Sequence, residues 1–106
     1  MIVDMRTYSF QPGKMAAWLK VYEEFLWPLQ QKYLGNCLGF YTSTEGKLNN
    51  VVHLWGYESM ADRDARRAAM MQDPGWPVYQ QKVAALEGFV AQENSILKPT
   101  PFFAAK

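Results

Sequence analysis

Residues that could do chemistry stand in two short segments of this chain. His53 is the single histidine, and it precedes Trp55 in a stretch rich in β-branched and aromatic residues. Arg6 and Tyr8 occupy a similar stretch near the N-terminus. An arginine can hold an anionic or enolate oxygen, a histidine can move a proton near neutral pH, and aromatic rings can stack on a ligand. His53 and Arg6 are therefore the candidate catalytic groups.

Alternation along these two segments puts the candidates on one side of a sheet, because successive side chains of a strand point to opposite faces. We expect this side to be the open one, since the smaller and purely apolar alternate residues Val52, Leu54 and Gly56 suit a face covered by helices. The same logic places Val3, Met5 and Thr7 of the N-terminal segment under the helices. The predicted binding residues of the open face are Arg6, Tyr8, His53, Trp55, Tyr57 and Gln92.

The elements that position these residues follow from periodicity. Alternating and β-branched runs predict strands over residues 2–10, 36–45, 48–58 and 88–97, the middle two joined by a tight turn at Gly46-Lys47. Apolar spacing of three and four predicts a helix over residues 14–33, which Pro28 should kink near Leu26 or Trp27. Further helices are predicted over residues 60–72, opened by a capping pair of Ser59 and Asp62, and over residues 76–86.

This element order predicts the ferredoxin-like βαββαβ arrangement of the α+β class. We expect a four-stranded sheet of antiparallel type, with the first and third strands adjacent at its centre and parallel to one another. Helices cover one face, and a second copy should cover the aromatic open face, forming a homodimeric α/β barrel. The 106 residues are one domain, in which residues 98–106 form a C-terminal tail that either straps the partner or is disordered.

Composition excludes several classes of function. A net charge of +1 without a basic stripe argues against a nucleic-acid partner, and no apolar run is long enough for a membrane span. The N-terminal stretch does not look like a secretory signal, so we expect a cytoplasmic protein. Cys37 and His53 fall short of the about four ligands of a structural zinc site, so we expect no metal and no cofactor. A Cys37–His53 nucleophilic pair is an alternative only if the two share a face.

Three segments together resemble the NIPSNAP family over nearly the whole chain. They are DMRTYSFQPGK at residues 4–14, VVHLWGYESMADRDARRAAMMQDPGW at residues 51–76 and QENSILKPTPF at residues 92–102. The most specific parts are the His53-x-Trp55-x-Tyr57 motif running into Ala61-Asp62-Arg63, then Asp73-Pro74-x-Trp76, and the closing Leu97-x-Pro99-Thr100-Pro101-Phe102. As a set these motifs are far more specific than any one of them.

The resemblance implies a dimeric α+β barrel. It also implies kinship with a superfamily of cofactor-free antibiotic-biosynthesis monooxygenases, muconolactone isomerases, haem-degrading enzymes and chlorite dismutases. It assigns no reaction, and the adaptor role of longer animal members is not expected here, since this sequence shows no targeting extension. His53 does not match the helical haem ligand of the haem-degrading relatives.

Two hypotheses follow. In the first, a dimer binds a small molecule between the sheet and the helices or between the two sheets, and cofactor-independent oxygenation or isomerisation is the alternative to binding alone. Arg6 then holds an anionic oxygen, His53 moves a proton, and Tyr8 and Trp55 stack on the ligand. In the second, the barrel is a non-enzymatic interaction module, and His53 and Arg6 bond to Asp4, Gln92 or a partner residue and fix the register of the dimer.

Overall fold

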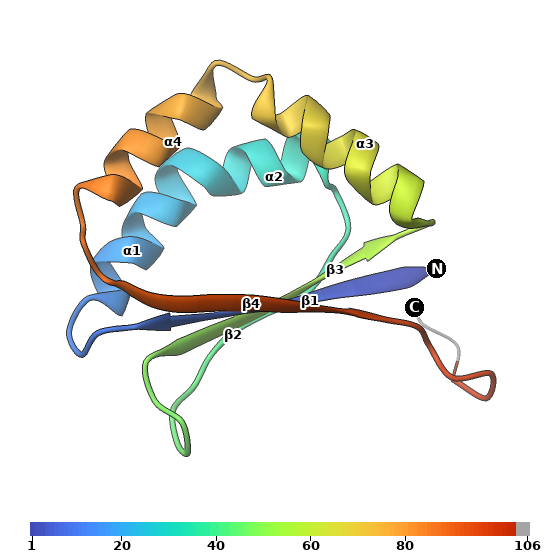
Figure 1. The fold of residues 1–106 in the computed structure, drawn as a ribbon, viewed down its shortest axis with the longest axis horizontal. Coiled ribbons are helices and arrows are strands. Elements are labelled where there is room, and N and C mark those ends of the chain that lie inside the picture. Colours follow the sequence, from blue (N-terminus) through green and yellow to red (C-terminus); the bar gives the residue numbers. More distant parts are fainter. Residues whose placement is uncertain (104–106) are drawn as a thin grey trace.

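The computed structural model describes residues 1–103, and it places every helix on one face of a single sheet (Figure 1). The strands are β1 (Ile2–Phe10), β2 (Cys37–Thr42), β3 (Asn50–Tyr57) and β4 (Phe89–Leu97). The helices are α1 (Met15–Val21), a π-helical turn η1 (Tyr22–Leu26), α2 (Trp27–Tyr33), α3 (Met60–Met71) and α4 (Gly75–Ala84). This is the α+β ferredoxin-like order that periodicity predicts.

The sheet order is β2-β3-β1-β4, and all neighbouring strands are antiparallel. The prediction that the first and third strands lie side by side is therefore confirmed, but their parallel orientation is wrong. The helical crossover makes β1 and β2 run the same way, and the following hairpin reverses β3. Within one subunit the sheet is open rather than closed into a barrel (Figure 1).

The two faces of the sheet are the reverse of those expected. Trp55 and His53 of β3 are 1% and 0% exposed, and both lie under the helices, where Trp27 packs 6.0 Å from Trp55 and Tyr22 packs 6.1 Å from His53 between ring centroids. Val52 and Leu54 of β3, with Val3, Met5 and Thr7 of β1, consequently point to the uncovered face and are half-buried.

Side-chain volume explains the inversion. A helical layer stands well above the sheet, and large rings are needed to fill the space between them at the density of a protein interior. The core is accordingly aromatic on both layers, and its buried apolar residues are Ile2, Phe10, Trp18, Tyr22, Leu26, Leu34, Val51, Trp55, Tyr57, Met70 and Tyr79. Small apolar residues would have left voids in this layer.

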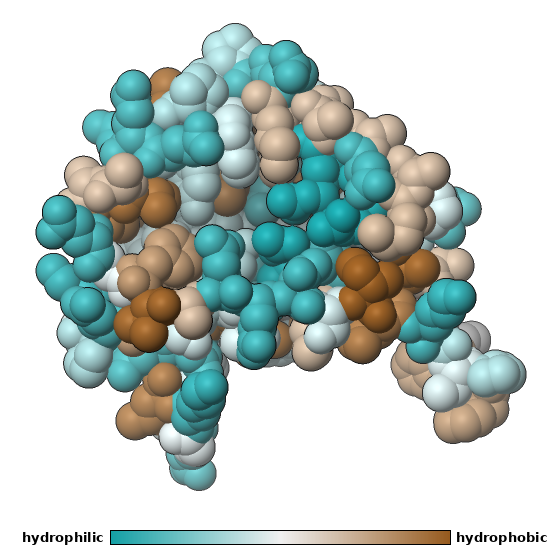
Figure 2. All heavy atoms as spheres, viewed as in Figure 1, coloured by the Kyte–Doolittle hydropathy of each residue, from teal (hydrophilic) through white to brown (hydrophobic). Residues whose placement is uncertain are grey.

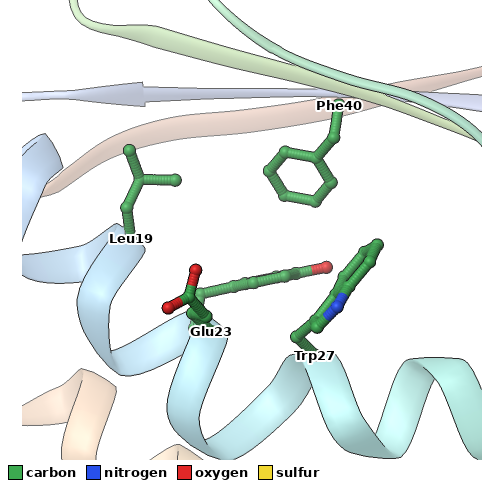
Figure 3. Close-up of a pocket in the computed structure, with 5 residues that line it drawn as sticks. Leu19, Glu23, Trp27 and Phe40 are labelled. Carbon is green, nitrogen blue, oxygen red and sulfur yellow. The ribbon is translucent and has the colours of Figure 1, made fainter.

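The long first helix is interrupted where proline predicts. Pro28 has no amide hydrogen to donate, and it stands in the first turn of α2, where that donor is not needed. The interruption is not a simple kink but the π-helical turn η1, which inserts one extra residue into the hydrogen-bonded ring. Leu19, Glu23 and Trp27 lie on one side of the α1–η1–α2 segment (Figure 3).

Of the other local predictions, the helix cap is confirmed, the tight turn is wrong and the strap stays a prediction. The capping pair is confirmed, since the Asp62 amide donates to Oγ of Ser59 at 3.1 Å. The tight turn between β2 and β3 is wrong, because a longer loop over residues 43–49 connects them, with Gly46 and Asn49 at positive φ. Residues 98–103 project from the end of β4, and Phe102 among them is 91% exposed. The predicted strapping of a partner extends into residues outside those described and stays a prediction.

Candidate functional site

A cavity of about 410 Å³ lies between the helices and the β1–β4 side of the sheet. Arg6 and Tyr8 reach it from β1, Gln92 from β4, and Arg67 from α3. The other lining residues are Leu26, Gln30, Met70, Met71, Trp76, Tyr79, Gln80, Val83, Ala84 and Phe89. We call this space the arginine cavity. Figure 2 shows hydrophilic side chains gathered over the layer between the helices and β4, in the middle of that view.

A buried carboxylate anchors one end of this region. Asp4 is 0% exposed, and its Oδ2 accepts from Nη1 of Arg6 at 3.2 Å and from Nε of Arg63 at 3.0 Å. Its Oδ1 accepts from Nδ2 of Asn94 at 3.0 Å. Burial alone would raise the pKa of Asp4, but these hydrogen bonds and the two guanidinium charges hold it below its usual value. Asp4 is therefore an ionised group shared between two arginines.

Arg67 differs from its neighbours because it has no carboxylate partner among residues 1–103. It is half-buried, and burial together with the charges of Arg6 and Arg63 lowers its pKa. A guanidinium remains protonated even so, since its ordinary pKa is above about 12. Arg67 thus lies near two arginines that share one buried carboxylate, and the cavity wall carries excess positive charge.

Arg6 connects this charge to the aromatic core. Its Nε donates to the hydroxyl of Tyr8 at 3.0 Å. The Tyr8 ring meets His53 edge-on at a centroid distance of 4.9 Å and Phe89 at 5.6 Å. Burial lowers the pKa of Arg6, but Tyr8 and Asp4 outweigh that effect and raise it overall. Tyr8 therefore stands between the cavity and the histidine.

His53 is held as an uncharged donor. The indole Nε1–H of Trp55 donates to Nδ1 of His53 at 2.8 Å, so the proton of the neutral ring resides on Nε2. Burial, with the charge of Arg6 as the next cause, lowers the pKa of His53 to about 3. Among residues 1–103, the buried Nε2 has no hydrogen-bond partner. In this state His53 can donate a hydrogen bond from Nε2, but it is poorly suited to the proton transfer near neutral pH that the sequence suggests.

Other buried polar atoms of the same layer also lack a partner within the described part of the chain. They are Nε1 of Trp18, the hydroxyls of Tyr22 and Tyr57, and Oε1 of Gln30. Most buried polar groups in folded proteins are hydrogen-bonded, so each exception needs an explanation. Gln30 lines the arginine cavity itself, where a polar group of a bound molecule would satisfy it.

The structure separates the predicted binding residues into two groups. Arg6, Tyr8 and Gln92 line the arginine cavity, whereas His53 and Trp55 are buried in the sheet beside it. Tyr57 lines a different hollow, with Met1, Asn36, Gly56, Glu58 and Arg66.

Sequence reasoning missed the helical half of this site. The candidates named from the sequence do not include Arg67, although Arg63, Arg67 and Met70 share one face at helical spacing, which is the available signal. Trp76 and Tyr79 also line the cavity, and Tyr79 is buried at 8% exposure.

Cys37 has surroundings that suppress reactivity. Its thiol donates to the carbonyl oxygen of Gly39 at 3.5 Å, and burial raises its pKa, which disfavours the thiolate. Across the sheet Cys37 pairs with Trp55, and it is Phe40 that pairs with His53. Among residues 1–103, no three His, Cys, Asp or Glu side chains gather in a way that could hold a metal ion, and no helix is both long and apolar enough to span a bilayer.

Comparisons with a family model and with curated proteins identify the same family. The NIPSNAP family model matches residues 3–104. The chain is 33% identical over 73 residues to a NipSnap homolog of Dictyostelium discoideum, which is 69% of this chain and 32% of that protein. It is 28% identical over 101 residues to a NipSnap protein of Caenorhabditis elegans, which is 95% of this chain and 18% of that protein. The chain thus spans a third or less of the length of these curated relatives.

Solved structures agree in fold. A protein from Agrobacterium tumefaciens is 36% identical with a TM-score of 0.88, and the match covers 96% of each chain. A NIPSNAP domain protein from Burkholderia xenovorans is 30% identical with a TM-score of 0.89, covering 99% of this chain and 100% of that one. An antibiotic biosynthesis monooxygenase is 15% identical with a TM-score of 0.63, covering 95% and 100%, and shares the fold alone. With its motifs, its fold and its family match in agreement, the chain belongs to the NIPSNAP family.

Proposed function

We propose that this protein is a homodimer in which each subunit binds a small anionic molecule with an apolar body in the arginine cavity. The proposal is carried by the position of Arg67 on the wall of a cavity that Arg6 also lines. The Arg67 guanidinium is half-buried and has no carboxylate partner in the described chain. A buried charge is costly unless it is paired. An anion in the cavity would supply the missing pair.

The rest of the cavity wall supports an apolar body for this ligand. Met70, Trp76, Tyr79 and Phe89 line it, and about 410 Å³ falls within the range of about 300–1,000 Å³ that small-molecule sites occupy. Carboxylates suit the site because a guanidinium can bind both of their oxygens with two parallel hydrogen bonds. Gln92 and Gln30 offer amide groups for a second polar group on the ligand.

Cofactor-independent chemistry is a second candidate, and one observation favours it. Arg6 and an uncharged His53 flank the same Tyr8 side chain. A fixed cation beside neutral donors is an arrangement that can stabilise an enolate or phenolate as charge develops. The shared fold of the monooxygenase is no evidence for this reaction, since the two chains are 15% identical.

The open face supports the homodimer. By alternation, Val3, Met5, Val52 and Leu54 point away from the helices and are half-buried, and Tyr41 beside them is 60% exposed. An exposed apolar sheet face is typical of an interaction surface. The β2–β3 loop and residues 98–103 project on either side of this face (Figure 1). A second copy would cover it in an isologous contact.

The test begins with native mass spectrometry of the freshly purified protein, which should show a dimer. Calorimetric titrations then compare phenylacetate with phenylacetamide and octanoate with octanamide. Each acid should bind at least about tenfold more tightly than its amide, a difference of about 1.4 kcal/mol. Arg67→Met should abolish the preference for the acids.

Arg66→Met is the matched control, because Arg66 is the adjacent residue but pairs with Asp62 at the surface. It should leave the preference unchanged. Equal affinity for acid and amide, or equal losses in the two arginine variants, would refute anion binding. A monomer in the mass spectrum would refute the dimer independently of the ligand.

A further inference from the structure

A second hollow, of about 320 Å³, lies where the α1–η1–α2 segment faces β2. Leu19, Glu23 and Trp27 reach it from the helical side, and Phe40 reaches it from the sheet (Figure 3). Tyr22 completes the lining. We call this hollow the aromatic corner. It shares no lining residue with the arginine cavity, and the function proposed above does not use it.

Three rings form the walls of the aromatic corner at different angles. Trp27 and Phe40 are nearly perpendicular, at 88° and 5.9 Å between centroids. Tyr22 lies 5.0 Å from Phe40 at 59° and 6.5 Å from Trp27 at 40°. Because no two of the rings are stacked face to face, a group placed in the corner can meet more than one ring face. This geometry differs from a filled aromatic core, in which rings cover one another.

The charge of the aromatic corner is negative. Ring faces carry the negative part of the aromatic quadrupole and attract cations within about 6 Å. Glu23 adds a carboxylate at the rim, and within residues 1–103 it forms no ion pair. Among the residues that the structure describes, no lysine or arginine lines the hollow. An organic cation therefore complements this site, whereas an anion complements the arginine cavity.

The aromatic corner has few hydrogen-bond acceptors, and this limits which organic cations can bind in it. A primary ammonium has three N–H groups to satisfy, and a guanidinium has five. The side-chain acceptors lining the corner are the carboxylate of Glu23 and the hydroxyl of Tyr22, which is buried and has no partner in the described chain. A methylated ammonium has few or no N–H groups and loses little hydration when it meets aromatic faces. The walls therefore match an alkylated ammonium better than a lysine or an arginine.

We propose that the aromatic corner binds a quaternary or methylated ammonium group, with the faces of Tyr22, Trp27 and Phe40 around the cation and Glu23 as its counter-charge. The π-helical turn η1 is what builds the site. An α-helix rotates about 100° per residue, so the extra residue of η1 changes the direction of Trp27 relative to Tyr22 by a large angle. Such turns occur frequently at functional sites.

The test uses choline and its uncharged isostere 3,3-dimethyl-1-butanol as probes. Each is titrated into the full chain while the indole Nε1–H signals of the four tryptophans are followed by NMR. Choline should shift the Trp27 signal with a saturable dissociation constant, and the uncharged isostere should bind at least about fivefold more weakly, as expected for a partly exposed cation–π site. Equal affinity of the two probes would show an apolar groove and overturn the proposal.

Two neighbouring glutamates provide a matched pair of variants. Glu23→Gln should weaken choline binding severalfold, whereas Glu24→Gln should leave it unchanged, because Glu24 is exposed and does not line the hollow. Trp27→Leu should abolish the saturable response in the remaining indole signals while phenylacetate binding at the arginine cavity is retained. Equal effects of the two glutamate variants, or no Trp27 shift with excess choline, would overturn the proposal without bearing on the arginine cavity.

Discussion

The two faces of the sheet bury their residues by different rules. The helix-covered face contains a fully buried carboxylate and a fully buried histidine, both 0% exposed. The open face carries mainly small apolar residues such as Val52 and Leu54, and they are only half-buried. Asp4 is tolerated inside because Arg6, Arg63 and Asn94 satisfy its oxygens. Burial therefore follows side-chain volume and the availability of partners rather than hydrophobicity alone.

The largest expected effect comes from removing the buried carboxylate. Asp4→Ala leaves Arg6 and Arg63 without their shared counter-charge, and breaking a buried pair in this way costs about 3–5 kcal/mol. Urea unfolding at a fixed protein concentration measures the loss. Asp64→Asn is the control, since Asp64 also contacts Arg63 but is 66% exposed, and it should cost about 1 kcal/mol or less. Equal losses would remove the distinction between the faces.

The buried histidine predicts a dependence on pH. The pKa of His53 falls from an ordinary 6.5 to about 3 on folding, so the unfolded chain binds more protons between these values. The contribution of neutral His53 to the free energy of unfolding is fully present above about pH 6.5. It declines by about 1.4 kcal/mol per pH unit as the pH falls toward 3.

Unfolding curves of the wild type and of His53→Gln between pH 7 and pH 4.5 isolate this contribution, because His53 is the single histidine. The difference in unfolding free energy between the two proteins should shrink as the pH falls. A constant difference would mean that His53 is not buried in its neutral form.

Loss of the dimer is the next smaller effect. Leu54→Lys places a charge on the proposed contact face, where Leu54 is half-buried, and should weaken dimerisation by about tenfold or more. The fold of the subunit should persist, as measured by circular dichroism beside sedimentation equilibrium. Ala65→Lys adds the same charge on the exposed side of α3 and should leave the dimer intact. An unchanged dimer in Leu54→Lys would exclude this face as the contact.

The smallest expected effect on stability belongs to Arg67. Arg67→Met removes a half-buried charge that has no carboxylate partner in the described chain and that lies near Arg6 and Arg63. Thermal unfolding should show a stability that is unchanged or raised by up to about 1 kcal/mol, because an apolar replacement of an uncompensated charge is often stabilising. A loss of more than about 2 kcal/mol would make Arg67 a structural residue and contradict its role in binding.

Much of the fold could be predicted, because alternation in residues 2–10 and 51–57 and helical spacing in residues 60–71 are strong local signals. The choice of covered face could not, because alternation defines two faces without saying which one a helix meets. The pairing of Asp4 with Arg63 could not be predicted from local sequence patterns either, since the two residues are 59 positions apart. Pro28 indicated an interruption but not that η1 would rotate Trp27 toward Phe40.

The exposed edge strand β4 has a kinetic consequence. All nine of its residues are exposed, and its sheet neighbour is β1. Such a strand can open locally while β1 and β3 stay paired, so its amide protons should exchange with solvent well before those of the central strands. Phe89 and Gln92 of β4 line the arginine cavity. A molecule bound against these two side chains should therefore slow amide exchange along β4.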